Sequence, residues 1–103
     1  MVRSDPPTIH DFLSFEAQNR PRPPGISPRE WAGVSMFSDW ESLRQMLKRI
    51  RRLRTGLCAV VEIPEEGPVE IRQTFQRGHY TVWAAPEFLL ACVVEVVHDE
   101  SLQ

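Results

Sequence analysis

An amphipathic stretch in the middle of the chain constrains the fold more than any other feature of the sequence. From Trp40 to Leu53, apolar side chains recur at steps of three and four residues, which places them on one face of a helix (Trp40, Leu43, Met46, Leu47, Ile50, Leu53). Ser38 and Glu41 form a capping-box pattern at its start, and Lys and Arg side chains fill its last turns. The sequence therefore predicts a helix over 39–53.

About five β-prone runs accompany this helix, and most of them follow it. A short run lies at 34–37, and the others lie at 57–63, 69–75, 79–83 and 92–97. Because turn-forming residues at 64–68 separate two of these runs, we expect 57–63 and 69–75 to form a hairpin. Since strands gather late in the chain, the pattern favours an α+β domain over alternating βαβ units.

Two shorter helices are predicted before residue 34. Thr8 and Asp11 match a capping pattern for a helix that extends to about Ala17. Ser27 precedes Pro28, which suits the first position of a second helix, of about one turn.

The length of 103 residues suits one domain. We expect 1–7 to be a mobile tail, 8–98 to be a single α+β domain and 99–103 to be a polar tail. The domain is predicted to hold one mostly antiparallel or mixed sheet of about four to five strands, covered on one face by the helix at 39–53.

Charge is divided unevenly along the chain. Residues 1–54 hold ten Arg and Lys against six Asp and Glu, and residues 55–103 hold two against eight, which gives +4 and −6 and matches the net charge of −2. A net acidic chain has no global attraction to nucleic acid or to membranes. No apolar run has the length of a secretory signal or a membrane span. Cys58 and Cys92 lie in apolar runs, as buried free thiols do, so we expect a cytoplasmic protein.

Several common functional motifs are absent. The sequence contains neither the glycine pattern of dinucleotide-binding loops nor that of the phosphate-binding loop. His10, His79 and His98 lie too far apart in the sequence to form a short-spaced metal-ligand set, and so do the two cysteines. No metal or cofactor is predicted from these motifs.

The segment 78–83 carries the chemistry-bearing residues of the late strands. His79, Thr81 and Trp83 share one strand face, while Tyr80 and Val82 share the other. The catalytic candidates are His79, Tyr80 and the strand carboxylate Glu62. Each also has a structural interpretation, with Trp83 in the core, His79 bonded to a loop carbonyl and Glu62 in solvent.

Arginines supply most of the binding candidates. Six cations lie between Arg44 and Arg54, and a second basic stretch lies in the proline loop at 20–24. The predicted binding residues are Arg49, Arg52, Arg54, Arg20, Arg22 and Trp83. Nucleic acid is the disfavoured partner, because no aromatic side chains interleave with these cations and the chain is net acidic.

One family resemblance follows from the order of motifs. The run 33–38, the helix after it and the run 58–64 together resemble the middle of ADP-ribosyltransferase-like domains, in which such a helix packs behind an NAD cleft. The resemblance covers 33–97 and implies an NAD site beside Gly78-His79-Tyr80. The chain departs from that family's pattern, because it lacks the early strand with Arg or His and the catalytic glutamate.

Two functions remain as hypotheses. The first is a small non-enzymatic binding or regulatory module that acts through a protein partner, which fits the missing catalytic set and the divided charge. The alternative is a reduced ADP-ribosyltransferase-like domain that binds NAD or another nucleotide through Gly78-His79-Tyr80. The sequence itself assigns no catalytic activity, pathway or oligomeric state.

Overall fold

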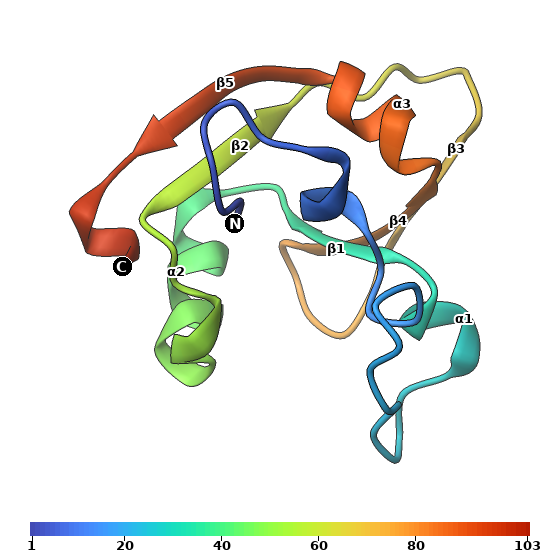
Figure 1. The fold of residues 1–103 in the computed structure, drawn as a ribbon. Coiled ribbons are helices and arrows are strands. Elements are labelled where there is room, and N and C mark those ends of the chain that lie inside the picture. The colour runs from blue at the N-terminus through green and yellow to red at the C-terminus, as the bar shows by residue number, and fades with distance from the viewer.

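The computed structural model describes residues 1–103, and its strands form two separate sheets (Figure 1). The first sheet has the order β1-β4-β3 and the second has the order β2-β5. The bounds are β1 Val34–Phe37, β2 Leu57–Val61, β3 Val69–Gln73, β4 His79–Ala84 and β5 Val93–His98. The α+β class and the antiparallel pairing are confirmed. The prediction of one continuous sheet is wrong.

The expected hairpin between 57–63 and 69–75 is also wrong. β3 pairs with β4, with Val69 opposite Ala84, whereas β2 pairs with β5, with Leu57 opposite His98. The link after β2 contains two prolines, which lack the N–H that a tight ladder needs. The helix α3 (Pro86–Ala91) then carries the chain from the first sheet to the second.

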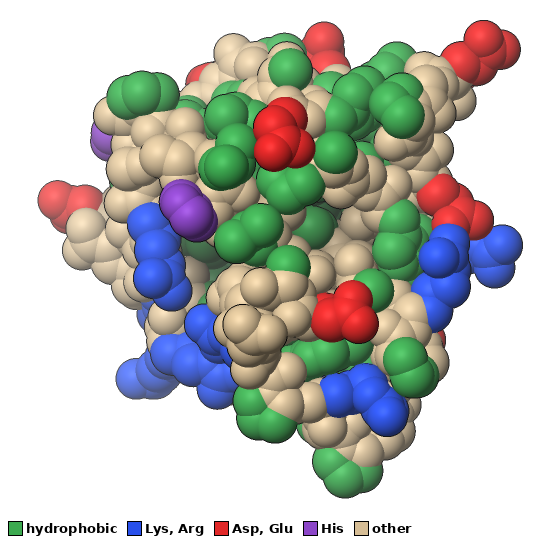
Figure 2. All heavy atoms as spheres, turned by 45° about the vertical axis from the view of Figure 1, so that its right-hand side comes forward, with side chains coloured by type: hydrophobic (Ala, Val, Ile, Leu, Met, Phe, Trp, Pro, Cys, Tyr) green, Lys and Arg blue, Asp and Glu red, His purple; other side chains and the backbone are tan.

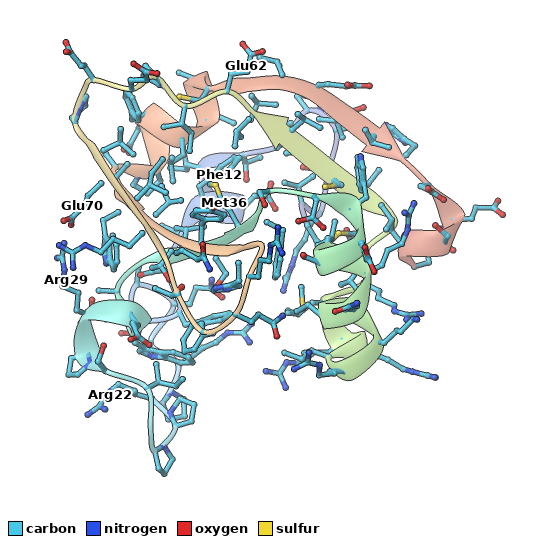
Figure 3. All side chains as sticks on the ribbon, turned by 180° about the vertical axis from the view of Figure 1, so that it is seen from behind. Phe12, Arg22, Arg29, Met36, Glu62 and Glu70 are labelled. Atoms are coloured by element: carbon cyan, nitrogen blue, oxygen red, sulfur yellow. The ribbon has the colours of Figure 1, made fainter.

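The main core lies between the two sheets. Its buried members are Val2, Phe12, Val82 and Leu89, and apolar side chains of all five strands pack against them. Figure 3 shows Phe12 and Met36 together in this interior. The inner face of the first sheet is therefore covered by the 3₁₀ turn η1 (Ile9–Phe12), by α3 and by the second sheet.

The amphipathic helix α2 (Trp40–Arg49) packs where the two sheets meet. Its buried side chains Leu43 and Leu47 contact a second cluster that contains Leu102, with Phe37 from β1 and Cys58 from β2 around it. The expectation that this helix covers a sheet face is not confirmed. With ten residues α2 is the longest helix, so no helix in the structure could cross a lipid bilayer.

Both ends of α2 differ from the prediction. The N-cap is Asp39 rather than Ser38, and its carboxylate accepts the backbone N–H of Ser42 at 2.8 Å. The helix ends at Arg49, and a 3₁₀ turn, η2 (Arg51–Leu53), follows. Trp40, expected in the buried stripe, is 40% exposed, because the first helical residue lies beyond the cluster that α2 covers.

Of the two predicted N-terminal helices, the first is shorter than predicted and the second has the predicted length of about one turn. The helix expected to reach Ala17 is the single turn η1, and it ends where Leu13 adopts an extended conformation. Phe15 then leaves the helical stripe and packs on Trp31, with ring centroids 4.8 Å apart. The second helix, α1 (Pro28–Trp31), is confirmed, and Ser27 Oγ accepts the N–H of Glu30.

Packed side chains occur near both chain ends. Val2 is 2% exposed, and its N–H donates to the carbonyl oxygen of Leu57. Leu102, in the 3₁₀ turn η3 (Glu100–Leu102), is 0% exposed, and its carbonyl oxygen accepts the N–H of Gly56. The tails expected at 1–7 and 99–103 therefore each place one side chain in a core cluster.

Candidate functional site

His79 is the first residue of β4, and its side chain contacts the segment that connects β3 to β4. Its Nδ1 lies 2.9 Å from the hydroxyl oxygen and 3.1 Å from the carbonyl oxygen of Thr74. The Thr74 hydroxyl lies 2.7 Å from that of Thr81. Phe37 and Phe75 pack on the imidazole, with ring centroids 5.0 and 5.1 Å away. No carboxylate lies within hydrogen-bond distance of the ring. The contacts of His79 instead stabilise the turn between β3 and β4.

Burial controls the protonation of His79. The side chain is 8% exposed. Loss of water around the imidazole lowers its pKa, and the hydrogen bond to the backbone of Thr74 and the charge of Glu30 oppose this effect only in part. The imidazole is therefore neutral at physiological pH.

The three catalytic candidates do not share a site. Tyr80 lies on the opposite face of β4 from His79, as the alternation of a strand requires. Glu62 is exposed and directly follows β2, a strand of the other sheet, and Figure 3 shows it at the outer edge of the molecule. Glu95, the other strand carboxylate, is exposed on β5. No group of His, Cys, Asp and Glu side chains is arranged to hold a metal ion.

Trp83 anchors α1 to the first sheet. Its indole N–H donates to the carbonyl oxygen of Arg29 at 2.8 Å, and the Arg29 guanidinium lies 4.4 Å from the ring centroid. Arg29 also forms an ion pair with Glu70 of β3, and Figure 3 shows these two side chains together. The tryptophan ring is therefore already engaged within the chain.

Two of the arginine candidates bind nearby carbonyl groups. Arg54 Nε donates to the carbonyl oxygen of Leu47 at 3.0 Å, and Nη1 donates to that of Gln103 at 3.2 Å. This side chain therefore satisfies the open C-terminal end of α2. Arg22 Nη1 donates to the carbonyl oxygen of Ile26 at 2.6 Å, within the proline loop.

A cavity of about 690 Å³ lies between β1, β2, α2 and the N-terminal segment. Its volume is in the range of ligand-binding pockets. Apolar side chains make up more than half of the lining, 16 of 28 residues. Two of the predicted binding residues, Arg20 and Arg52, are among the polar ones, together with Arg3, His10, Asp11 and Asp39. The cavity therefore has an apolar lining with several basic side chains.

The edge of β1 that borders this cavity has unpaired backbone groups. The N–H of Ser38 donates to the carbonyl oxygen of Gly78, and antiparallel bonding alternates along a strand. Val34 and Met36 therefore bond to β4, whereas the backbone groups of Ser35 and Phe37 point away from it. No hydrogen bond engages these outward groups.

β2 has a similar free edge on the same cavity. The N–H of Asp99 donates to the carbonyl oxygen of Gly56, so Cys58 and Val60 bond to β5. The backbone groups of Ala59 and Val61 point outward, and no other backbone group binds them. Leu57, the first outward residue of β2, is already engaged, because its carbonyl oxygen accepts the N–H of Val2 and its own N–H donates to Thr55 Oγ1. The other four outward residues of the two strands line the cavity, so two unpaired stretches of strand edge border one space.

A basic cluster adjoins this cavity at the end of α2. It consists of four exposed residues, Lys48, Arg49, Arg51 and Arg52, and none has a carboxylate within 4.0 Å. Arg49 makes one hydrogen bond, to the side-chain oxygen of Gln76 at 3.3 Å. Figure 2 shows basic side chains gathered at the lower left of one face, the side on which α2 lies in Figure 1.

Cys58 and Cys92 are free thiols. They lie at different places along the β2–β5 pair, because Cys58 is opposite Val97 and the carbonyl oxygen of Cys92 accepts the N–H of Glu62. Burial raises the pKa of the Cys58 thiol, which keeps it protonated at neutral pH.

Comparisons with protein-family models, with curated proteins and with solved structures found no match to this chain.

Proposed function

We propose that this chain is a non-enzymatic binding module that takes an extended segment of a partner protein into the cavity between β1 and β2. The observation that supports this function is the pair of unpaired strand edges on one cavity. An extended peptide satisfies such edges through its own backbone groups, and its alternate side chains enter apolar pockets.

The chemistry of the lining favours a peptide over a small polar metabolite. Outward N–H and C=O groups of Ser35 and Phe37 repeat every second residue, which matches the backbone of an extended chain. Apolar side chains such as Val34, Met36 and Val60 supply the surface that alternate peptide side chains bury.

The nucleotide-binding alternative has less support. A Cβ at Gly78 would lie 2.2 Å from Ser42 Oγ, so this glycine packs directly against α2 and does not border an open space. His79 and Tyr80 face opposite sides of β4. Stabilisation by NAD in a thermal-shift assay, lost in His79→Ala, would favour the nucleotide-binding function instead.

The experiment begins with selection of binders from a random 12-residue peptide display library. Enriched peptides are synthesised and titrated calorimetrically, each in a series that carries one backbone N-methyl group at successive positions. Strand addition between the two edges predicts that N-methylation weakens binding at successive positions within the cavity and has little effect beyond it, because the N–H groups of a central strand pair alternately with its two neighbours.

A protein variant tests directly whether the free edge of β1 binds the peptide. Ser35→Pro removes an N–H that β4 does not use, and edge strands tolerate proline at such positions. We expect this variant to lose peptide binding, whereas the control Ser35→Ala keeps it. Failure to enrich any peptide, or binding that no N-methyl group affects, would overturn the proposal even if Ser35→Pro does not fold.

A further inference from the structure

The basic cluster at the end of α2 contains more positive charges than are needed to cap the helix or to compensate its dipole. The N–H of Ile50 bonds to the carbonyl oxygen of Met46, and Arg54 satisfies that of Leu47. Arg51 and Arg52 lie beyond the last helical residue, in η2, and their side chains make no hydrogen bond or ion pair. Capping and dipole compensation therefore do not account for these two side chains.

Arg52 joins this cluster to the cavity, because it belongs to both. The carboxylates that line the cavity are already engaged within the chain. Asp11 accepts the backbone N–H groups of Arg3 and Thr8, each at 2.9 Å, and Asp39 caps α2. Arg52 and the rest of the basic cluster are therefore cations beside the cavity that have no carboxylate partner.

We infer that the partner segment carries Asp or Glu residues immediately outside the strand that enters the cavity, at the end that leaves beside Arg52. This inference rests on the proposed function, since it concerns the flank of the same peptide. A peptide fits better than a nucleic acid, because Trp40, the one aromatic residue of α2, lies at the opposite end of that helix near the Arg44 guanidinium.

The test compares two peptides that share one selected strand sequence. One carries three Glu residues at the flank and the other carries three Gln residues, which have nearly the same shape. Two exposed ion pairs predict about fivefold tighter binding of the Glu peptide at 50 mM NaCl. The difference should shrink at 300 mM NaCl, because salt screens exposed charges.

The protein variant is the double substitution Arg51→Gln/Arg52→Gln, which changes only exposed side chains. It should remove the difference between the two peptides, because it removes the two cations that the acidic flank would pair with. The matched control is Arg72→Gln, because Arg72 is exposed on β3 and does not line the cavity. This control should keep the fivefold difference.

The outcomes separate this inference from the proposed function. Equal binding of the Glu and Gln peptides to the unchanged protein would overturn the acidic flank and leave strand addition standing. Tighter binding of a 12-nucleotide single-stranded RNA than of the Glu peptide, lost in the double variant, would also overturn it. Failure of both peptides to bind would remove the proposed function together with this inference.

Discussion

Leu102 is the penultimate residue of the described chain, yet it is one of the most deeply buried side chains. It is 0% exposed and packs with Leu43 and Leu47 of α2. We predict that Leu102→Ala strongly destabilises the fold, because the substitution opens a cavity against the only apolar face of that helix. Glu100→Ala is the control, since Glu100 is exposed in the same turn.

The expected size of the effect follows from the burial of Leu102. Complete burial of a leucine side chain contributes about 1.5–3 kcal/mol, and Leu-to-Ala changes in cores cost about 2–5 kcal/mol. A site near a chain end relaxes more easily than one in mid-chain, so we expect about 2–3 kcal/mol. A domain of this size has a stability of about 5–15 kcal/mol in total.

Circular dichroism during heating measures this loss. For a domain near 100 residues, each kcal/mol lowers the melting temperature by about 4–8 °C, so Leu102→Ala should melt about 10–20 °C below the unchanged protein. Glu100→Ala should melt within about 2 °C of it. A Leu102→Ala protein that melts with the Glu100→Ala control would show that η3 is not packed on α2.

Three further predictions concern other contacts. Because burial lowers the folded pKa of His79 below the unfolded value near 6.5, the folded state should lose stability as pH falls through 6.5, and His79→Gln should reduce that loss in urea titrations at pH 7.5 and 5.5. Gly33→Ala places a Cβ 2.2 Å from a methyl carbon of Thr81 and should cost about 1–3 kcal/mol in the same assay. Asp39→Ala should lower the melting temperature more than Ser38→Ala, because Asp39 accepts the capping bond.

Each of these has a clear contrary result. Equal pH dependence of stability in His79→Gln and the unchanged protein would place the imidazole in solvent. An unchanged unfolding free energy in Gly33→Ala would mean that β4 does not pack on this glycine. A larger effect of Ser38→Ala than of Asp39→Ala would restore the serine as the N-cap.

Local elements were predictable because their signals are local. The stripe that contains Leu43 and Leu47 repeats with the helical period, and both residues are buried. The end of the helix was not predictable, because Ile50 continues the stripe in sequence while its backbone leaves the helical region, at φ −122° and ψ 77°. Arg54 then folds back on Leu47, a contact that hydrophobic periodicity does not encode.

Strand pairing was not predictable, because it depends on distant partners. Two adjacent β-prone runs with a turn between them are typical of a hairpin, but β5 takes the place beside β2 after α3 reverses the chain. The cavity was not predictable from the sequence for the same reason. Its walls come from the edges of two different sheets, so only Arg20 and Arg52 among the predicted binding residues line it.

The attachments of Val2 and Leu102 to residues 55–57 have a practical consequence. Val2 bonds to Leu57 and Leu102 bonds to Gly56, so both ends of the described chain meet at the start of β2. A short flexible linker could therefore join them covalently, with new ends opened in the exposed turn at 64–67. Such a circular permutant would keep both sheets and move bulky fusion partners to the side of the molecule opposite α2.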